Sequence, residues 1–218
     1  MAEPSTQRPD TAAEALATLR AGNDRFVQGS RSIQQANYTQ ARREDLAAGQ
    51  HPFAIVLSCS DSRVPSELVF DCGLGDLFVV RVAGNVVAPS LVGSVEFAAS
   101  AFNTKLVVVM GHTACGAVSA TLKELRKQGG TLSDNVRDIV ERIAPAVAEL
   151  VESGLPEAEL SRAATRANVR VSAGHLRHSS RLLEKRIADG LLAIVGAEYD
   201  LQTGRVDFFD LPPSLAGK

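Results

Sequence analysis

The sequence lacks three features that would assign it to a specialised class of protein: a basic excess, a long apolar run and a dense set of cysteines. Its 23 Lys and Arg residues are offset by 25 Asp and Glu residues, giving a net charge of -2. That balance argues against a dedicated nucleic-acid binder. No apolar run approaches the roughly 20 residues that a membrane span needs. The three cysteines are too few for a disulfide scaffold and are better explained as metal ligands or buried thiols.

The N-terminal segment, MAEPSTQRPD, is polar and contains no apolar stretch of the kind found in secretory signals. We therefore expect a cytoplasmic protein with neither a nucleic-acid nor a membrane partner. The 218 residues are enough for one α/β domain with its own core. We expect a disordered tail at 1–10, a single domain at 11–210 with a helical arm at 11–49, and a C-terminal tail at 211–218.

Apolar patterning predicts an α/β fold. Three short runs without polar alternation are typical of strands buried on both faces; they lie at 53–58, 76–83 and 105–111. Helical patterns alternate with them and begin near residues 11, 39, 89, 134 and 157, the last extending to about Asp189. Two further strands, LLAIVGAEYD and RVDFFD, flank the turn residues QTG and predict a hairpin. This alternation indicates a mainly parallel sheet covered by helices on both faces.

Two of the apolar runs end in residues that can bind a metal. Cys59 follows the run 53–58, and His112 and Cys115 follow the run 105–111. Ligand sites of parallel sheets lie at the carboxyl ends of the strands, so two thiolates and one imidazole can converge there. Two cysteines and one histidine are a known ligand set for catalytic zinc, which keeps one position open for water or substrate. Thiolates also favour zinc over magnesium or calcium.

The residues around these ligands fit a catalytic site. The spacing of His112 and Cys115 fits a strand-end histidine and a cysteine on the first turn of a helix, where the helix dipole keeps a thiol ionised. Asp61 can orient a hydroxide nucleophile, and Arg63 can hold Asp61 by a bidentate pair. Asp61 can also swing onto the metal and close the site. Each motif alone has an ordinary explanation, as a core cysteine or a surface ion pair, but their joint placement favours a zinc site.

The segments CSDSRV (59–64) and GHTACG (111–116) together resemble the signature of the β-carbonic anhydrases. The resemblance extends from the N-terminal helices to about Asp210. The zinc ligands that it implies are Cys59, His112 and Cys115, and the catalytic pair that it implies is Asp61 and Arg63. The activity implied is the zinc-dependent, reversible hydration of CO2 to bicarbonate and a proton.

The resemblance also implies a sheet of four or five strands and N-terminal helices that pack on a neighbouring subunit, so we expect a homodimer or homotetramer. The substrate-binding residues that it implies are Gln50, Phe78, Ala83 and Phe97. Without the resemblance, Gln50 would be an ordinary solvated residue at a helix end, and the other three would be plain core residues.

Two other functions remain open on the residues alone. One is a hydrolase on the same scaffold that acts on a linear CO2 analogue such as CS2 or COS. The other is a non-enzymatic module that binds zinc or bicarbonate. The chain also has no tryptophan, and Val56 stands where some family members use one to build a second bicarbonate pocket, although Arg81 and Tyr199 match the rest of that pocket. We therefore expect bicarbonate to act here mainly as product.

Overall fold

The computed structural model describes residues 8–30 and 39–216. Its elements in chain order are α1 (Ala12–Gln28), α2 (Gln40–Ala47), β1 (Ala54–Ser58), α3 (Ser66–Val69), β2 (Leu77–Arg81), the 3-10 turn η2 (Ala83–Asn85), α4 (Pro89–Ala101), β3 (Leu106–His112), α5 (Gly116–Leu125), α6 (Asp134–Val147), the 3-10 turn η3 (Ala148–Glu152), α7 (Glu157–His178), α8 (Arg181–Ala188), β4 (Ala193–Tyr199) and β5 (Val206–Asp210). Most of the expected N-terminal tail, part of the helical arm and the last two residues of the C-terminal tail lie outside the described residues.

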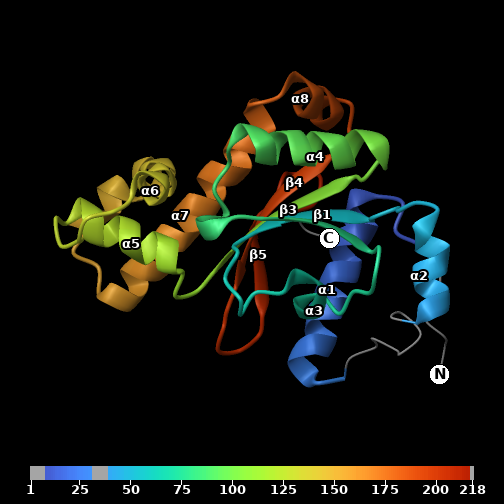
Figure 1. The fold of residues 1–218 in the computed structure, drawn as a ribbon, viewed down its shortest axis with the longest axis horizontal. Helices are drawn as coiled ribbons and strands as arrows, with labels where there is room; N and C mark the ends of the chain where they lie inside the picture. The colour runs from blue at the N-terminus through green and yellow to red at the C-terminus, as the bar shows by residue number, and fades with distance from the viewer. Residues whose placement is uncertain (1–7, 31–38, 217–218) are drawn as a thin grey trace.

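The strands form one five-stranded sheet in the order β2-β1-β3-β4-β5. Strand β1 pairs in parallel with β2 and β3, and β3 pairs in parallel with β4. Only the pairing of β4 with β5 is antiparallel, and it is the expected hairpin. The sheet lies between helices on both faces (Figure 1). The expected α/β fold with a mainly parallel sheet is confirmed.

The strands differ in burial according to their place in the sheet. Every residue of β1, β3 and β4 is buried, as expected for β-branched runs with helices on both sides. Strand β2 lies at the edge, and its apolar residues are only half-buried while Arg81 is exposed. The prediction that residues 76–83 are buried on both faces is therefore wrong. Composition alone cannot distinguish an edge strand from a central one, because strand order depends on pairings far apart in the chain.

Helix α1 covers one face of the sheet, together with α3 (Figure 1). It begins at a capping box in which Thr11 and Glu14 exchange hydrogen bonds, and it ends at Gly29 with a φ of 68°. Its apolar positions Leu16 and Leu19 are buried in the core of its own chain. A neighbouring subunit is thus not needed to cover α1. Packing of the N-terminal helices on a neighbouring subunit stays a prediction. Helix α2 is now the helix that supports it, because none of its residues is buried in this chain.

The opposite face of the sheet is covered by α4, α7 and α8. The expected helical stretch from 157 to 189 is two helices, α7 and α8. The break falls at Ser179 and Ser180, and the Ser180 side chain caps α8 by accepting a hydrogen bond from the Leu183 N–H. A serine that can accept such a bond favours the start of a new helix.

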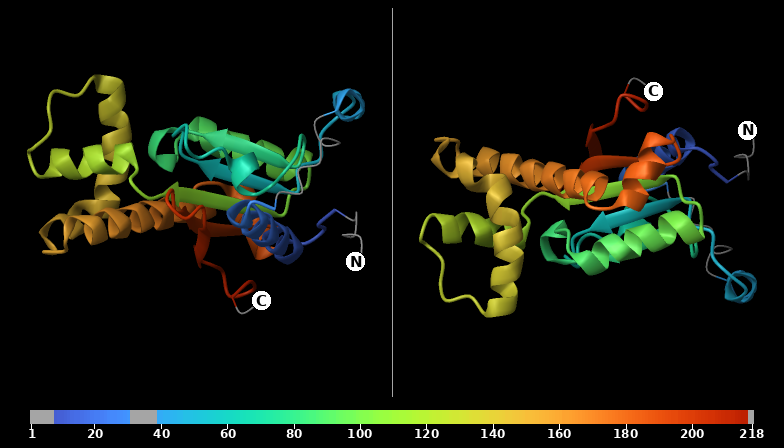
Figure 2. Two further views of the ribbon diagram at one scale, coloured as in Figure 1. Left: turned by 90° about the horizontal axis from the view of Figure 1, so that it is seen from below. Right: turned by 90° about the horizontal axis from the view of Figure 1, so that it is seen from above.

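Helices α5 and α6, with the first turns of α7, form a group that projects beyond the carboxyl ends of β1 and β3 (Figure 2). They share an apolar cluster with Cys59 and Cys115. This helical group therefore covers the edge of the sheet at which the metal site was predicted. Past β5, Leu215 is buried against the core under α1. Within residues 8–30 and 39–216, no helix is both long and apolar enough to cross a membrane.

Candidate metal centre

The three predicted metal ligands lie at the ends of two neighbouring strands. Cys59 follows β1 directly, and His112 is the last residue of β3. These strands are paired in parallel, with Ser58 opposite Met110. The candidate ligand atoms of Cys59, His112 and Cys115 all lie within 4.8 Å of one another, and all three residues are buried. The structure therefore brings the two thiols and the imidazole together at one edge of the sheet.

The histidine is arranged to offer a lone pair. Its Nδ1 lies 2.9 Å from the carbonyl oxygen of Thr113, which can only accept, so Nδ1 carries the proton and donates it. Its Nε2 is fully buried and has no hydrogen-bond partner among the residues that the structure describes. A buried polar atom without a partner is costly. A metal ion would satisfy Nε2, and neutral imidazole with two thiolates is a donor set that fits zinc.

The two cysteine thiols shift each other's pKa in opposite directions. A hydrogen bond from the Cys115 thiol is the largest cause that lowers the pKa of Cys59, to about 4, against the opposing effect of burial. The same contact raises the pKa of Cys115 above its usual range. Cys115 is the N-cap residue of α5, and the backbone N–H groups of Ala117 and Val118 in the first turn partly oppose this rise in its pKa. One thiolate is thus already favoured, and the charge of a bound dication would favour the second.

Asp61 and Arg63 form a bidentate pair beside the ligands. The Nε of Arg63 donates to one carboxylate oxygen of Asp61 at 2.9 Å and its Nη2 donates to the other at 2.7 Å. The Arg63 backbone N–H adds a third hydrogen bond at 3.0 Å. The Arg63 side chain holds the pKa of Asp61 well below its usual range. The pair with Arg63 thus favours the ionised carboxylate, and its Oδ2 lies 3.8 Å from Nε2 of His112, next to the ligand cluster.

Two further residues support Cys59, and sequence reasoning gave neither of them this role. Arg81, the last residue of β2, donates to the carbonyl oxygens of Cys59 at 3.0 Å and of Asp61 at 2.7 Å. The N–H of Gly84 donates to the sulfur of Cys59 at 3.3 Å. Both come from the strand and turn beside β1, so only the strand order brings them here. The resemblance matched Arg81 with a second bicarbonate pocket and placed Gly84 near the active-site cleft, but it did not indicate contacts with Cys59.

The predicted substrate-binding residues are dispersed in this chain. Ala83 adjoins Gly84 and is therefore close to Cys59. Phe78 pairs with Ile55, at the opposite end of β1 from Cys59. Phe97 is 56 % exposed on α4, and its ring centroid lies 6.3 Å from that of Phe78. Gln50 is exposed and precedes β1. The structure thus brings Ala83 to the ligand cluster and leaves the other three away from it.

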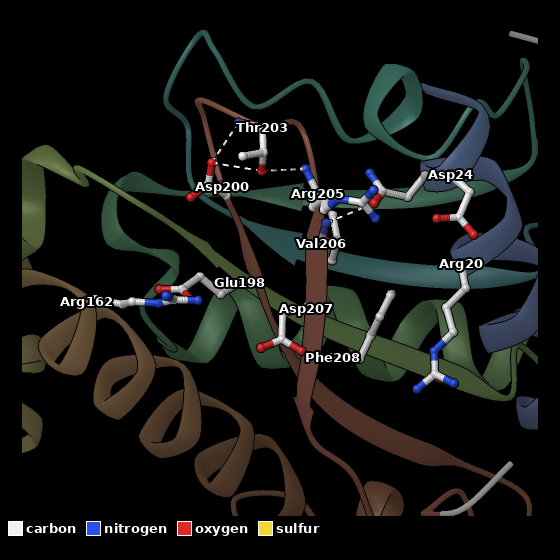
Figure 3. Close-up of a pocket in the computed structure, with 11 residues that line it drawn as sticks. Arg20, Asp24, Arg162, Glu198, Asp200, Thr203, Arg205, Val206, Asp207 and Phe208 are labelled. Atoms are coloured by element: carbon white, nitrogen blue, oxygen red, sulfur yellow. Dashed lines mark hydrogen bonds and ion pairs between the residues drawn. The ribbon is translucent and has the colours of Figure 1, made fainter. Parts of the chain in front are cut away.

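A large surface pocket lies elsewhere, between α1, α7 and the β4–β5 hairpin (Figure 3). Arg162 reaches across it to the buried carboxylate of Glu198, 3.0 Å away, and Arg166 donates to the same oxygen at 2.9 Å. Arg20 stacks over the ring of Phe208 at its margin. These contacts tie α7 and α1 to the hairpin. None of the three candidate metal ligands lines this pocket.

Comparison with known proteins agrees with this geometry. Residues 54–206 match the family model described as carbonic anhydrase. That range includes both cysteine-bearing loops and most of the sheet. The chain belongs to the β-carbonic anhydrase family.

Three relatives illustrate the match. The chain is 43 % identical to carbonic anhydrase 2 of Mycobacterium tuberculosis, over 88 % of this chain and 89 % of that one. It superposes on the β-carbonic anhydrase CafA of the fungal pathogen Aspergillus fumigatus with a TM-score of 0.69 and 29 % identity, over 83 % of this chain and 88 % of that one. A tetrameric β-carbonic anhydrase of Sordaria macrospora shares the fold, with a TM-score of 0.70 and 24 % identity over 80 % and 89 % of the two chains.

This carbonic anhydrase therefore catalyses the reversible hydration of CO2 to bicarbonate, with zinc as its cofactor. Of the functions left open by the sequence, CO2 hydration is the one that the relatives share. Neither the hydrolysis of a linear CO2 analogue nor a binding role without catalysis is needed to explain the site.

Proposed function

We propose that Cys59, His112 and Cys115 hold the zinc of this carbonic anhydrase. The observation that carries this assignment is the convergence of their ligand atoms within 4.8 Å around the buried Nε2 of His112. Zinc bound to such a set lowers the pKa of water and so supplies a hydroxide nucleophile near neutral pH. Three protein ligands leave a fourth position for the reaction, which is the mark of a catalytic site.

Asp61 and Arg63 act on the nucleophile in this proposal. An ionised carboxylate can only accept hydrogen bonds, so Asp61 would accept one from the O–H of a hydroxide supplied at the metal site and would thereby orient that nucleophile toward CO2. Arg63 engages both oxygens of Asp61, which keeps the carboxylate from binding the metal itself. The carboxylate is thus fixed before substrate arrives, and fixed polar groups need no reorganisation during the reaction.

We further propose that a second copy of the chain completes the substrate pocket, giving a homodimer or homotetramer. The rings of Phe78, Phe97 and Phe102 form a cluster along the outer edge of the sheet, with Phe97 and Phe102 5.5 Å apart edge to face. Phe78 and Phe102 are half-buried and Phe97 is exposed, and an exposed aromatic side chain on such a cluster is typical of an interface. In such an assembly, Phe78, Phe97 and Gln50 of one copy would lie beside the ligand cluster of the neighbouring copy.

A cytoplasmic location and a single domain at 11–210 complete the proposal. The metal-binding thiols must stay reduced, and the cytoplasm provides this. The domain boundaries are supported by the capping box at Thr11 and by the hairpin that ends at Asp210. Buried Leu215 and the contact of Lys105 with Asp10 show that short flanking stretches also touch the core.

The assignment of the ligands is tested by metal analysis and stopped-flow CO2 hydration on zinc-loaded protein. Cys59→Ser should bind zinc far more weakly and lose most of its activity. Cys72→Ser is the matched control, because Cys72 is also buried but belongs to the apolar core under α1. Zinc bound by Cys59→Ser with the parent affinity would contradict the ligand assignment.

The proposed interface is tested by Phe97→Asp, which places a charge in the aromatic cluster. We expect light scattering to show a smaller assembly and the hydration rate to fall with it. Leu182→Asp is the control, since Leu182 is also an exposed apolar residue, at 39 %, but lies on α8. A Phe97→Asp variant that kept both the parent assembly and the parent rate would rule out this surface.

A further inference from the structure

The turn η2 contacts Cys59 and is itself held by a side chain of helix α7. The side-chain amide of Asn168, on α7, donates to the carbonyl oxygen of Gly84 at 2.7 Å. The N–H of the same glycine donates to the sulfur of Cys59 at 3.3 Å. Asn168 is 99 % buried, so this contact is part of the interior. A chain of two hydrogen bonds thus connects the middle of α7 with one of the proposed zinc ligands.

The position of Gly84 leaves this turn little freedom. Its φ is +69°, a conformation that residues with a side chain rarely adopt. A Cβ at Gly84 would lie 2.7 Å from Cδ1 of Ile143 and 3.0 Å from Cβ of Ala117. Side chains of α5 and α6 therefore pack against the turn, and Asn168 of α7 binds the carbonyl oxygen of Gly84. The peptide group between Gly84 and Asn85 is held at both atoms, since Asn168 donates to its carbonyl and its N–H donates to the carbonyl oxygen of Val82 at 3.1 Å, and this fixes the direction of the neighbouring Gly84 N–H toward the sulfur.

We infer that Asn168 is a positioning residue for the metal centre, acting through Gly84 on the sulfur of Cys59. An N–H that points at a thiolate stabilises its negative charge and moderates its donation to a bound metal. Asn168 touches neither substrate nor ligand, so its effect depends on orienting the peptide of Gly84. The inference rests on the proposal that Cys59 is a zinc ligand.

The variant that isolates this role is Asn168→Asp, which keeps the shape of the side chain but replaces the donor amide by an acceptor. The carbonyl of Gly84 then loses its hydrogen bond and faces an added negative charge. We expect the zinc affinity, measured by competition with a chelator at fixed pH, to fall by about 10-fold or more. In cobalt(II)-substituted protein, the absorption band from sulfur-to-metal charge transfer should shift, because the thiolate has lost part of its N–H hydrogen bond.

Asn23→Asp is the matched control. Asn23 is also buried, and its amide also donates to backbone carbonyls, those of Val69 and Gly204. Both variants should lower the melting temperature, but only Asn168→Asp should change the zinc affinity and the cobalt spectrum. Equal changes in both variants, or none in Asn168→Asp, would overturn the inference.

A measurement on the parent protein covers the case in which Asn168→Asp does not fold. In protein loaded with an NMR-active cadmium isotope, the amide proton of Gly84 should show scalar coupling to the metal through the hydrogen bond to sulfur. A Gly84 amide without such coupling would overturn the inference even where cadmium is bound by Cys59. If cadmium does not bind at all, or Cys59→Ser binds it equally well, the proposed function fails instead.

Discussion

The two loops that carry the cysteines are held in different ways. The loop at 59–63 is fixed by side chains from distant parts of the chain, since Arg81 binds two of its carbonyls and Gly84 donates to its sulfur. The loop at 112–115 is held mainly through its own residue Thr113, which bonds the backbone of Tyr199 and Leu201, with a longer contact of 3.4 Å from Arg63 to the carbonyl of Ala114. The first loop carries the proposed catalytic pair, and the second carries two of the three proposed zinc ligands. Long-range support thus coincides with the residues that must be oriented most accurately.

The largest expected effect is at Asp61, in the loop with long-range support. Asp61→Asn should keep zinc but lower kcat/KM for CO2 hydration by at least about 100-fold, because an amide presents one acceptor where the carboxylate presents two. Stopped-flow rates and metal content measure the two effects separately. Asp138→Asn is the control, since Asp138 forms a similar bidentate pair with Arg142 on the surface of α6. Hydration at the parent rate by Asp61→Asn would remove Asp61 from the proposed mechanism.

The comparison is tested most directly at Arg81. Arg81→Ala removes the donors to Cys59 and Asp61 together, so the loop at 59–63 should lose its fixed shape. We expect both the zinc affinity and the hydration rate to fall by about 10-fold. Arg81→Lys should recover part of each, because one ammonium can reach only part of what the planar guanidinium binds. If Arg81→Ala leaves the zinc affinity and the hydration rate unchanged, the loop at 59–63 does not need support from Arg81, and the contrast between the two loops is wrong.

The same contrast explains how far the sequence could predict the site. Cys59, His112 and Cys115 were predictable because each follows an apolar strand, and strands β1 and β3 proved to be neighbours. The contact between Gly84 and Asn168 was not predictable, because the two residues are 84 positions apart and meet only when α7 packs over the turn; the resemblance placed Gly84 near the active-site cleft and gave no role to Asn168.

The fold was predictable to a similar degree. The apolar runs predicted the strands and their parallel pairing, since such runs need helices on both faces. They did not predict that β2 forms an edge or that α1 covers its own core, because both depend on strand order and docking. The break at Ser180 did have a local signal, two consecutive serines that can cap a helix.

In the loop at 112–115, Thr113 provides the main hydrogen bonds to the neighbouring strand end. Its N–H donates to the carbonyl of Tyr199 at 3.0 Å, and its hydroxyl accepts from the N–H of Leu201 at 3.0 Å. Thr113→Val keeps the first bond and removes the second. We expect a loss of about 1 kcal/mol in the free energy of unfolding, measured by urea denaturation, with zinc affinity close to the parent value. A large drop in affinity would mean that the metal centre also depends on the bond between Thr113 and the backbone of Leu201.

The smallest effect is expected at Ala114, between His112 and Cys115, and its sign is informative. Ala114 has a φ of 54°, a left-handed conformation that costs a residue with a Cβ about 1 kcal/mol relative to glycine. Ala114→Gly should relieve this strain and raise the free energy of unfolding, less the greater entropy that glycine gives the unfolded chain. Ala120→Gly, inside α5, should lower it by about 1 kcal/mol, because glycine is unfavourable within a helix. Opposite signs for two Ala→Gly changes six residues apart would show that the backbone itself holds this loop. A loss of stability in Ala114→Gly equal to that in Ala120→Gly would instead mean that the loop at 112–115 carries no strain.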